Sequence, residues 1–377
     1  MTDVATNPDG RPIQTKGPVL VVGSGLLGAS AALALRAADI EVYLQDISPT
    51  SLALARDLGA GEAYDSSSPE PALVIVAVPP DVTAECVVSA LKEHPDAVVT
   101  DVASVKSIII DEVENSGIDT SKYVPSHPMA GRERSGAAAA DRDLFIGRPW
   151  VVVRRAGSDA SAQVVVRNLA VDLGATVLEM DAGEHDRGVA TVSHVPQLVA
   201  SLLAARLRDA TEESLDLAGQ GLRDTTRIAA SDPRLWTSIV SGNCGPVVDV
   251  LHEFRSDLDN LIEGLESGAR DGFGAHGSVG AINAVVSAGN DGVSRIPGKH
   301  GGAPQRWAIV EVLVPDKPGE LARLFSELGA VGINIEDLTI DHSAHQRVGA
   351  ARIAVEPTRA RDAEVELEAR GWRIVTQ

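Results

Sequence analysis

One histidine of this 377-residue sequence stands in a setting that suits proton transfer. His127 lies in "SHPMAGRERSG" (126–136), directly before Pro128 and a Gly-rich run with two arginines. Pro128 disfavours helical backbone at His127 and biases it toward an extended conformation. An imidazole can act as a general base because its ordinary pKa is near neutral pH. On local sequence alone, a loop histidine with a structural hydrogen bond is the commoner explanation, so the rest of the chain must decide.

Ser104 is the second candidate for chemistry. It follows the apolar run "AVVTDV" (97–102), while His127 ends the run "YVPSH" (123–127). In an open α/β sheet, ligands bind outside the carboxyl ends of the strands, so both side chains are expected at the reacting end of a bound cofactor. Ser104 could then orient the imidazole of His127. The alternative is that Ser104 is the N-cap of the helix "VKSIIIDEVE".

Two arginines suit the binding of an anionic substrate. Arg223 and Arg227 are four residues apart in "GQGLRDTTRIA" (219–229), and would share one face of a helix. A guanidinium group holds a carboxylate through two parallel hydrogen bonds. The alternative is a solvated face on which Asp224 pairs with Arg227. His185 and His194 lack metal-ligand spacing to another His, Cys or acid, so no metal site is predicted.

The first element that must position these residues is a dinucleotide-binding βαβ unit. The apolar run "PVLVVG" (18–23) leads into "GSGLLGASAALALRAADI", in which Gly23, Gly25 and Gly28 have the G-x-G-x-x-G spacing. A second strand, "EVYLQD", ends at Asp46, about 20 residues later, as this fingerprint requires. The helix N-terminus would face a pyrophosphate. The predicted cofactor contacts are Gly23, Ser24, Gly25, Leu26, Leu27, Gly28, Asp46, Val78 and Ser104.

Asp46 decides which cofactor is expected. It could be an ordinary turn residue at a strand end, but its place in the fingerprint favours recognition of the ribose hydroxyls. No arginine stands at 46–48 to hold a 2′-phosphate, so NAD is preferred to NADP.

The alternation of strands and helices predicts an α/β fold. Further apolar runs at 72–78, 97–102, 123–127 and 149–155, mostly separated by helix-like stretches, predict a Rossmann-type doubly wound parallel sheet with helices on both faces. From about residue 184 the pattern is all-helical, as in "GPVVDVLHEFRSDLDNLIEGL". "SDPRLW" predicts a helix start with Ser231 or Asp232 as N-cap and Pro233 in the first turn.

The last segment predicts a small ferredoxin-like domain. Its order is strand "RWAIVEVLV", helix "LARLFSELGAVG", strands "INIEDLTID" and "RVGAARIAVEP", helix "RDAEVELEARG" and strand "WRIVT", which is βαββαβ. Residues 267–305 have a composition typical of a linker, although a helix over 277–288 is compatible with it. The expected limits are a disordered tail 1–16, a Rossmann domain 17–182, a helical domain 183–295, a linker 296–305 and a final domain 306–377.

Composition excludes several classes of partner. The chain carries 53 acidic and 33 basic residues, a net charge of −20, so nucleic acid and anionic membranes should be repelled. Cys86 and Cys244 have no partner at disulfide or zinc spacing. The N-terminal stretch is polar, and we expect no apolar run to approach membrane-spanning length. Both features predict a cytoplasmic protein.

Six segments together carry a resemblance to a known family: "VVGSGLLGAS", "DVASVKS", "HPMAGRERSG", "LFIGRPWVV", "EHDRGVATVSHVP" and "LRDTTRIAASDPRLW". In this order they resemble prephenate dehydrogenases, including arogenate and mixed-specificity relatives, over nearly the whole chain. The C-terminal "VPDKPGELARLFSELGAVGINIEDL" resembles an ACT domain, an amino-acid-sensing module. The resemblance implies NAD-dependent oxidative decarboxylation of prephenate to 4-hydroxyphenylpyruvate in tyrosine biosynthesis, by a homodimer formed through the helical domain.

The resemblance also implies roles for particular residues. His127 would take the proton of the ring hydroxyl as hydride moves to NAD, and Ser104 would hydrogen-bond both His127 and that hydroxyl. The substrate pocket would be formed by Arg227, which binds the carboxylate, its neighbour Asp224, Glu133 at the pocket mouth, His194 and Trp236.

Two departures from the family bear on the substrate. Gln197 stands where several members have a second histidine, and Arg132 stands where others carry a small polar residue. Both would lie near the substrate side chain, in which prephenate and arogenate differ, so the preference between them stays open.

The ACT-like segment is expected to bind an aromatic amino acid, and tyrosine is the one expected. The residues expected there are Asp316, Pro318 and Gly319 in the turn "DKPGE", and Asn334 at the next strand. The alternative is that this segment only enlarges the dimer interface.

Two other functions fit the sequence less well. A dehydrogenase resembling 3-phosphoglycerate dehydrogenase would need a different Arg, Glu and His set, and its motifs are absent from the sequence. A non-catalytic sensor of NAD and amino acids would not need a base, whereas Ser104, His127 and Arg227 are all present.

Overall fold

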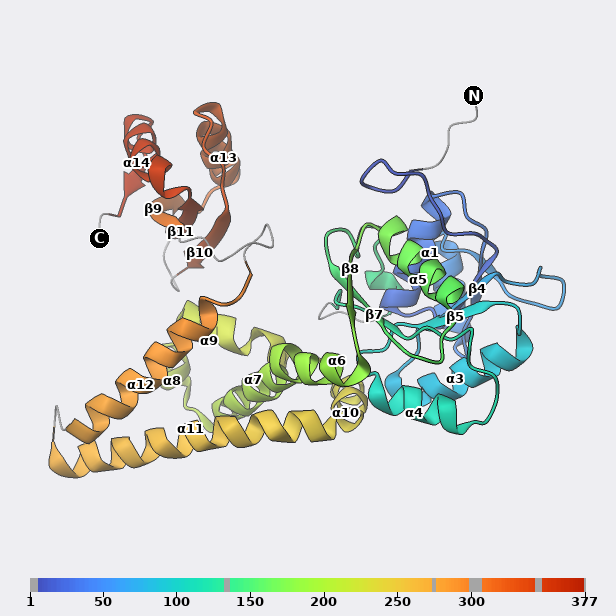
Figure 1. Ribbon diagram of the computed structural model, residues 1–377. Helices are drawn as coiled ribbons and strands as arrows, with labels where there is room; N and C mark the ends of the chain where they lie inside the picture. The colour runs from blue at the N-terminus through green and yellow to red at the C-terminus, as the bar shows by residue number, and fades with distance from the viewer. Residues whose placement is uncertain (1–5, 132–135, 273–275, 298–306, 343–347, 376–377) are drawn as a thin grey trace. The chain divides into compact units, whose positions relative to one another are not determined.

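A computed structural model describes residues 6–131, 136–272, 276–297, 307–342 and 348–375 (Figure 1). The chain forms two compact units. The first comprises Met1–Ala205 and Ile228–Glu253, and the second comprises Arg206–Arg227 and Phe254–Gln377. The first unit therefore includes helical segments beyond residue 182 as well as the Rossmann domain.

The core of the first unit is a five-stranded parallel sheet in the order β3-β2-β1-β4-β5. Its strands are β1 (Val19–Val22), β2 (Val42–Gln45), β3 (Glu62–Ala63), β4 (Leu73–Val76) and β5 (Val98–Asp101). In β1, Val19 and Val21 pack against one apolar layer and Leu20 against the other. Apolar residues on both faces favour a strand covered by helices on both sides, so the doubly wound fold is confirmed.

Helices cover both faces of this sheet. One layer contains α1 (Leu26–Ala37), α2 (Pro49–Asp57) and α5 (Ala160–Asp172). The other contains α3 (Pro80–Glu93) and α4 (Ser107–Asn115). Figure 1 shows α1 and α5 on one side of β4 and β5, with α3 and α4 on the other. The carboxyl ends of the strands are thereby left free to carry a site.

The expectation of one continuous parallel sheet up to residue 155 is wrong. A separate three-stranded sheet contains β6 (Ser126–Pro128), β7 (Pro149–Val153) and β8 (Thr176–Met180). Strand β6 pairs with β7 in antiparallel sense, and β7 pairs with β8 in parallel sense. Among the described residues between β6 and β7 there is only a short 3₁₀ turn, Ala137–Ala139, and no crossover helix that a parallel return would require.

The expected strand 123–127 is also interrupted. Tyr123 makes an isolated parallel bridge with Val99, which continues the main sheet beyond β5. Pro125 has no N–H to donate, and regular pairing begins only at Ser126. His127 nevertheless reaches the carboxyl edge of the sheet region as expected, because the segment runs beside β5.

Residues 6–16 do not form the expected disordered tail. The Asp172 carboxylate at the end of α5 accepts hydrogen bonds from the Gln14 N–H at 3.0 Å, the Thr15 N–H at 2.7 Å and the Thr15 hydroxyl at 2.7 Å. The buried Asn7 donates to the carbonyl of Val171 at 3.0 Å. These side-chain contacts fix a polar segment that has no apolar periodicity of its own.

From residue 182 the described chain is helical up to residue 293, as predicted. The helices are α6 (Ala182–Val189), α7 (Val195–Arg206), α8 (Glu212–Leu215), α9 (Gln220–Thr226), α10 (Pro233–Ser241), α11 (Cys244–Asp271) and α12 (His276–Val293). A π-helical turn, Ala190–His194, joins α6 to α7. Asp232 caps α10 by accepting the Arg234 N–H, with Pro233 in the first turn, as the sequence predicts.

The Gly-, Ala- and Ser-rich composition after residue 267 reflects close helix packing rather than a linker. A Cβ atom on Gly264 would lie 2.4 Å from the Cβ of Ala281, and one on Gly268 would lie 2.5 Å from the Cβ of Ser278. Small residues at these positions therefore allow α11 and α12 to approach each other. The compatible helix over 277–288 is confirmed, since it lies within α12 (His276–Val293), and α11 extends to Asp271.

The sequence was expected to contain no apolar run of membrane-spanning length. One helical run meets that criterion by its length and composition, so this expectation is wrong. The helical run Ala182–Asp209 has a mean hydropathy of 1.4 over its most apolar window, of which 33% is buried within the chain. Core helices of globular proteins meet the same criterion. Here the run carries His185, Asp186 and His194, all buried in contact with other residues of the first unit.

The C-terminal part of the second unit has the predicted βαββαβ order. Its elements are β9 (Ala308–Pro315), α13 (Glu320–Ala330), β10 (Asp337–His342), β11 (Val348–Val355), α14 (Ala360–Ala369) and β12 (Arg373–Ile374). The antiparallel sheet has the order β10-β11-β9-β12. Buried residues of both helices, such as Leu324 and Leu367, pack with the sheet in a core of their own.

Candidate active site

The turn between β1 and α1 needs glycine at two positions. Gly23 has a φ of +97°, and a Cβ there would lie 2.3 Å from the carbonyl oxygen of Ala77. A Cβ on Gly28 would lie 2.0 Å from the carbonyl oxygen of Gly23. Gly25, by contrast, faces open space, with no heavy atom within 4 Å of an added Cβ. Gly23 and Gly28 close the turn, and Gly25 leaves room for a pyrophosphate at the N-terminus of α1.

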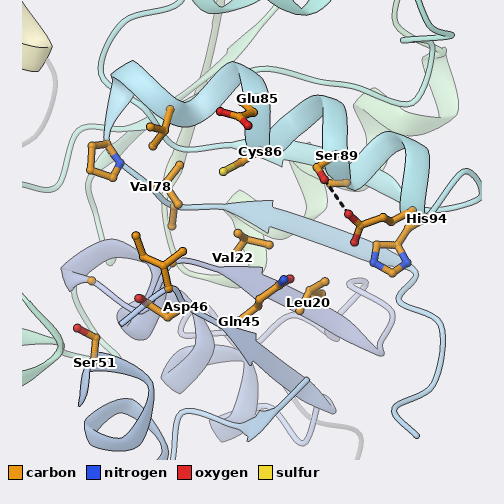
Figure 2. A pocket seen from close by; sticks show the side chains of 18 residues that line it. Leu20, Val22, Gln45, Asp46, Ser51, Val78, Glu85, Cys86, Ser89 and His94 are labelled. Atoms are coloured by element: carbon orange, nitrogen blue, oxygen red, sulfur yellow. Dashed lines mark hydrogen bonds between the residues drawn. The ribbon is translucent and has the colours of Figure 1, made fainter. Parts of the chain in front are cut away.

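A cavity of about 560 Å³ extends from this turn between β1, β2 and α3 (Figure 2). Asp46 lines it, and its carboxylate accepts the Ser24 N–H at 2.6 Å and the Ser48 N–H at 2.8 Å. Val78 lies on the opposite wall, and Ile47 exposes its whole side chain at the rim. All the lining residues belong to the described part of the chain, and none is arginine or lysine. The cavity therefore fits a dinucleotide without a 2′-phosphate.

Three further predicted cofactor contacts lie at the same turn. Leu26 and Leu27 begin α1, but their side chains pack against the apolar core, so only their backbone N–H groups can face a phosphate. Ser24 is fully buried, and within the described chain its hydroxyl has no hydrogen-bond partner. These residues shape the turn more than they line the cavity.

His127 is held by a second histidine and a carboxylate. Its Nδ1 lies 2.9 Å from Nε2 of His185, and the Nδ1 of His185 lies 2.8 Å from Oδ1 of Asp186. The two imidazole rings meet edge to face with centroids 5.1 Å apart. His185, Asp186 and His127 are 1%, 3% and 8% exposed, respectively. This buried chain of three residues orients the imidazole of His127 from the side of helix α6.

The predicted hydrogen bond from Ser104 to His127 is absent. The Ser104 hydroxyl oxygen is buried and has no partner among the described residues. Ser104 is not the N-cap of α4 either, since that helix begins at Ser107. The Asp186 carboxylate caps it instead, accepting the N–H groups of Lys106 at 2.9 Å and Ser107 at 2.8 Å. A carboxylate from another helix thus performs the capping expected of Ser104.

A buried ion pair fixes the strand that carries His127. The ammonium group of the fully buried Lys106 donates to the Asp101 carboxylate and to the carbonyl oxygen of Ser126, the latter at 2.8 Å. The Tyr123 hydroxyl donates to the other oxygen of Asp101 at 2.7 Å. These contacts anchor β6 to the end of β5. The sequence signal for them was an acid at the end of "VVTD" followed by a lysine in an otherwise apolar neighbourhood.

The protonation of these groups follows from their burial. Burial lowers the pKa of His127 well below its ordinary 6.5, and His185, Lys106 and His194 lower it further. Burial likewise lowers the pKa of His194, to about 4. Burial alone would raise the pKa of Asp186, but hydrogen bonds from His185, Ser107 and Lys106 outweigh it and hold that pKa below its usual value. At neutral pH the imidazoles of His127 and His194 are therefore neutral, and the Asp186 carboxylate is ionised.

His194 lies beside this group at the end of the π-helical turn. Its Nδ1 is 3.1 Å from the Asn243 amide nitrogen, which also lies 2.8 Å from the carbonyl oxygen of Asp186. The ring of Trp236 stands perpendicular to His194, with centroids 6.2 Å apart. Gln197 is buried one turn further along and lies 3.4 Å from the Ser201 hydroxyl. π-helical turns of this kind occur frequently at functional sites.

The remaining predicted substrate contacts lie elsewhere. Arg132 and Glu133 are outside the residues that the structure describes. Arg227 and Asp224 belong to the second compact unit, on α9 and the turn that follows it, and the Asp224 carboxylate accepts a hydrogen bond from Gln220 at 2.8 Å. Their role toward a substrate stays a prediction.

The predicted regulatory residues surround the turn between β9 and α13. Asp316 and Pro318 lie in this turn, and Gly319 has a φ of +91°, in the left-handed region that favours glycine. The Asn334 amide donates to the Glu336 carboxylate at 2.5 Å. The turn geometry fits the predicted role of Gly319, and effector binding itself stays a prediction.

The fold and the site together define a class of protein. A parallel sheet with a glycine turn, an acidic residue after its second strand and a neutral histidine at its carboxyl edge characterises a dinucleotide-dependent dehydrogenase. Three family profiles match the chain: "Prephenate dehydrogenase, nucleotide-binding domain" over residues 31–179, "Prephenate dehydrogenase, dimerization domain" over 181–276, and "ACT domain" over 308–370. The chain belongs to the prephenate dehydrogenase family, and it is an NAD-dependent dehydrogenase.

Individual relatives agree with this assignment. A probable prephenate dehydrogenase, NovF of Streptomyces niveus, is 36% identical over 94% of this chain and 98% of its own length. The prephenate dehydrogenase of Bacillus subtilis is 29% identical over 90% of this chain and 92% of its own. The crystal structure of the A. aeolicus prephenate dehydrogenase, in complex with hydroxyphenyl propionate and NAD+, is 30% identical and covers 72% of this chain and 97% of its own, with a TM-score of 0.63.

Proposed function

We propose that this protein converts prephenate to 4-hydroxyphenylpyruvate and carbon dioxide with NAD as oxidant, as a step of tyrosine biosynthesis. The observation that carries the proposal is a buried, neutral His127 held by His185, in a chain of the prephenate dehydrogenase family. A neutral imidazole can accept a proton at once, which a protonated one cannot. No other described residue of the first unit is a buried, neutral imidazole that is held by His185 at the carboxyl edge of the sheet.

The reaction needs a hydride acceptor and a base. NAD, held by the glycine turn and Asp46, would supply the acceptor for the hydride of the ring carbon that carries the hydroxyl group. His127 takes the proton of that hydroxyl through Nε2, the ring nitrogen not engaged by His185. The Ser104 hydroxyl, which has no partner within the described chain, is available to hydrogen-bond the same substrate oxygen. The expected arrangement had Ser104 hydrogen-bonded to both His127 and this hydroxyl, whereas here Ser104 is proposed to contact the substrate oxygen alone.

The ring carboxylate then leaves as carbon dioxide. Its bonding electrons complete the aromatic ring, the ring oxygen becomes a phenolate, and His127 returns the proton to it. The base is thereby restored, and no net proton is consumed. Lys106 and Asp101, which anchor Ser126 beside His127, keep the imidazole in place during both transfers. Arg227, with Asp224 nearby, is proposed to bind a substrate carboxylate, and Glu133 and Arg132 to line the pocket mouth.

The substrate preference rests on the pocket near His194. Gln197, where several family members have histidine, is buried and offers a neutral amide rather than a titratable ring. Prephenate carries a keto group where arogenate carries an ammonium group, and the neutral amide of Gln197 provides no charge with which that ammonium group could pair. Measuring kcat/KM for both substrates with NAD tests the assignment. A higher kcat/KM for prephenate supports it, and a higher value for arogenate would show an arogenate dehydrogenase with the same chemistry.

We further propose that the protein is a cytoplasmic homodimer regulated by tyrosine. Several large apolar side chains on the two long helices are exposed within a single chain: Phe254, Leu258, Ile262 and Leu265 on α11, and Val279, Ile282, Val285 and Val286 on α12. Their number and regular spacing favour burial against a second copy. The βαββαβ segment, which matches the ACT profile, is proposed to bind tyrosine at the turn that contains Gly319.

A further inference from the structure

The chain of residues behind His127 determines which of its nitrogens carries the proton. Asp186 is ionised and can only accept hydrogen bonds, so the Nδ1 of His185, 2.8 Å away, must be the protonated nitrogen of that ring. When His185 carries this one proton only, its Nε2 is unprotonated and faces His127. Because that nitrogen can only accept, the Nδ1 of His127, 2.9 Å away, must donate to it. The Nε2 of a neutral His127 is therefore left unprotonated.

We propose that His185 and Asp186 are positioning residues that fix His127 in the tautomer whose Nε2 can accept the substrate proton. This inference rests on the proposed function. It gives a role in that reaction to His185 and Asp186, in addition to His127 and Ser104. When His127 takes the proton, its imidazolium donates to His185, and the Asp186 carboxylate lies within the same hydrogen-bonded chain to balance the new charge. Lys106 and His194, which also neighbour His127, supply no negative charge.

A purely structural role for Asp186 is the competing explanation, because the same carboxylate caps α4 through Lys106 and Ser107. Asp172 provides a matched control. It is also buried, at 7% exposed against 3% for Asp186, and it also accepts backbone N–H groups, from Gln14 and Thr15. It has no histidine partner among the described residues. Asp172→Asn therefore removes a buried capping carboxylate without touching the chain of residues behind His127.

The kinetic test compares Asp186→Asn with Asp172→Asn in the full-length protein, with prephenate and NAD. An asparagine at 186 can donate to His185 and reverse both tautomers, so kcat should fall on the order of 10²–10⁴-fold. The KM for prephenate and the affinity for NAD should stay within a few-fold of wild type. Asp172→Asn should lower stability but leave kcat unchanged. Equal kcat values for the two variants, both near wild type, would overturn the proposal.

A second pair of variants serves if Asp186→Asn does not fold. His185→Gln keeps a carbonyl oxygen that can accept from Nδ1 of His127, whereas His185→Leu removes every acceptor. The proposal expects His185→Gln to retain at least tenfold more activity than His185→Leu, at similar thermal stability. Equal losses in both, with the same stability, would show that the hydrogen bond to His127 does not matter for turnover.

A spectroscopic measurement separates this inference from the proposed function. In ¹⁵N-histidine-labelled wild-type protein, long-range ¹H–¹⁵N correlations report the tautomer of each ring, and His127→Asn assigns the signals of His127. The expected result at neutral pH is a protonated Nδ1 and an unprotonated Nε2. The opposite tautomer would overturn the inference even in an enzyme active on prephenate. If the expected tautomer occurs in a protein without that activity, the proposed substrate fails and the tautomer assignment stands.

Discussion

Replacing His127 with asparagine should remove the base while keeping its structural hydrogen bond. The asparagine amide can donate to Nε2 of His185, as Nδ1 of His127 does at 2.9 Å. It has no atom in the place of the histidine Nε2. Because the histidine is neutral when folded, no buried charge is left unpaired by the change. The fold, the thermal stability and the affinity for NAD should therefore stay close to those of the wild type.

The expected loss of turnover follows from the role of a general base. Such a group contributes roughly 10²–10⁴-fold, which corresponds to about 2.7–5.4 kcal/mol of activation free energy at 1.36 kcal/mol per factor of ten. The assay is the initial rate of NAD reduction with saturating prephenate, combined with fluorescence titration of the cofactor. A variant that keeps near-normal kcat would refute the assignment of His127 as the base.

The pH profile gives an independent check on the same variant. An unperturbed imidazole would lose activity below a pH of about 6.5. Because burial and neighbouring groups lower the pKa of His127 well below that value, the wild-type kcat/KM should stay high through pH 6 and decline only in more acid solution. The residual rate of His127→Asn should lack this decline. A wild-type profile that falls with a midpoint above 6.5 would contradict the buried, neutral state of His127.

Three further predictions follow from other parts of the chain. Arg227→Ala should weaken prephenate binding by roughly 2–5 kcal/mol, as loss of a buried charge partner does, with no change in NAD affinity; an equal loss of NAD affinity would place Arg227 in the cofactor half of the site. Removal of residues 304–377 should leave an active enzyme that tyrosine no longer inhibits through the ACT domain. Calorimetric titration of tyrosine into the full-length and truncated proteins, together with inhibition assays, checks this prediction. Unchanged inhibition after truncation would refute it. The free energy of unfolding should fall as the pH drops from about 6.5 toward 4, because the unfolded chain takes up protons on His127 and His194 that the lowered pKa values of these residues exclude in the folded protein. The slope should reach up to about 1.4 kcal/mol per pH unit for each histidine. Urea titrations that show a constant free energy of unfolding between pH 7 and 5 would contradict this prediction.

Local patterns in the sequence were sufficient to predict the cofactor half of the site. The turn at Gly23 and Gly28 depends on contacts that no larger residue could make, so the spacing of the glycines carries the geometry directly. Asp46 follows a strand whose length and apolar pattern are both local signals. The βαββαβ order of the C-terminal segment was predictable for the same reason. The cap of α10 at Asp232 also depends only on adjacent residues.

The acid–base half could be predicted only for His127 itself. Its partner His185 is 58 positions away in the sequence, and the two meet only because α6 packs against the end of the sheet. The same packing brings Asp186 to the N-terminus of α4, where it caps the helix, and places His185 rather than Ser104 beside His127. A hydrogen bond across such a distance leaves no periodic signal in the sequence. The antiparallel direction of β7 against β6 was missed because it depends on the connection between them, whose described residues form only the 3₁₀ turn Ala137–Ala139.

Composition was misleading where one residue type serves two purposes. The Gly-, Ala- and Ser-rich composition after residue 267 suggested a linker, but small residues such as Gly268 and Ser278 permit close contact between α11 and α12. The polar stretch before residue 16 suggested disorder, but the buried Asp172 gives its backbone N–H groups a partner. In both cases the deciding interaction is with a residue that sequence position alone does not reveal.

The central claim is that this chain oxidises and decarboxylates prephenate in one active site. The most direct test follows NADH, carbon dioxide and 4-hydroxyphenylpyruvate together in a single reaction of the purified full-length protein with prephenate and NAD. The account predicts that all three form at the same rate and in equal amounts, and that their formation stops together in His127→Asn. Reduction of NAD without release of carbon dioxide, or no reduction of NAD with either prephenate or arogenate, would contradict it.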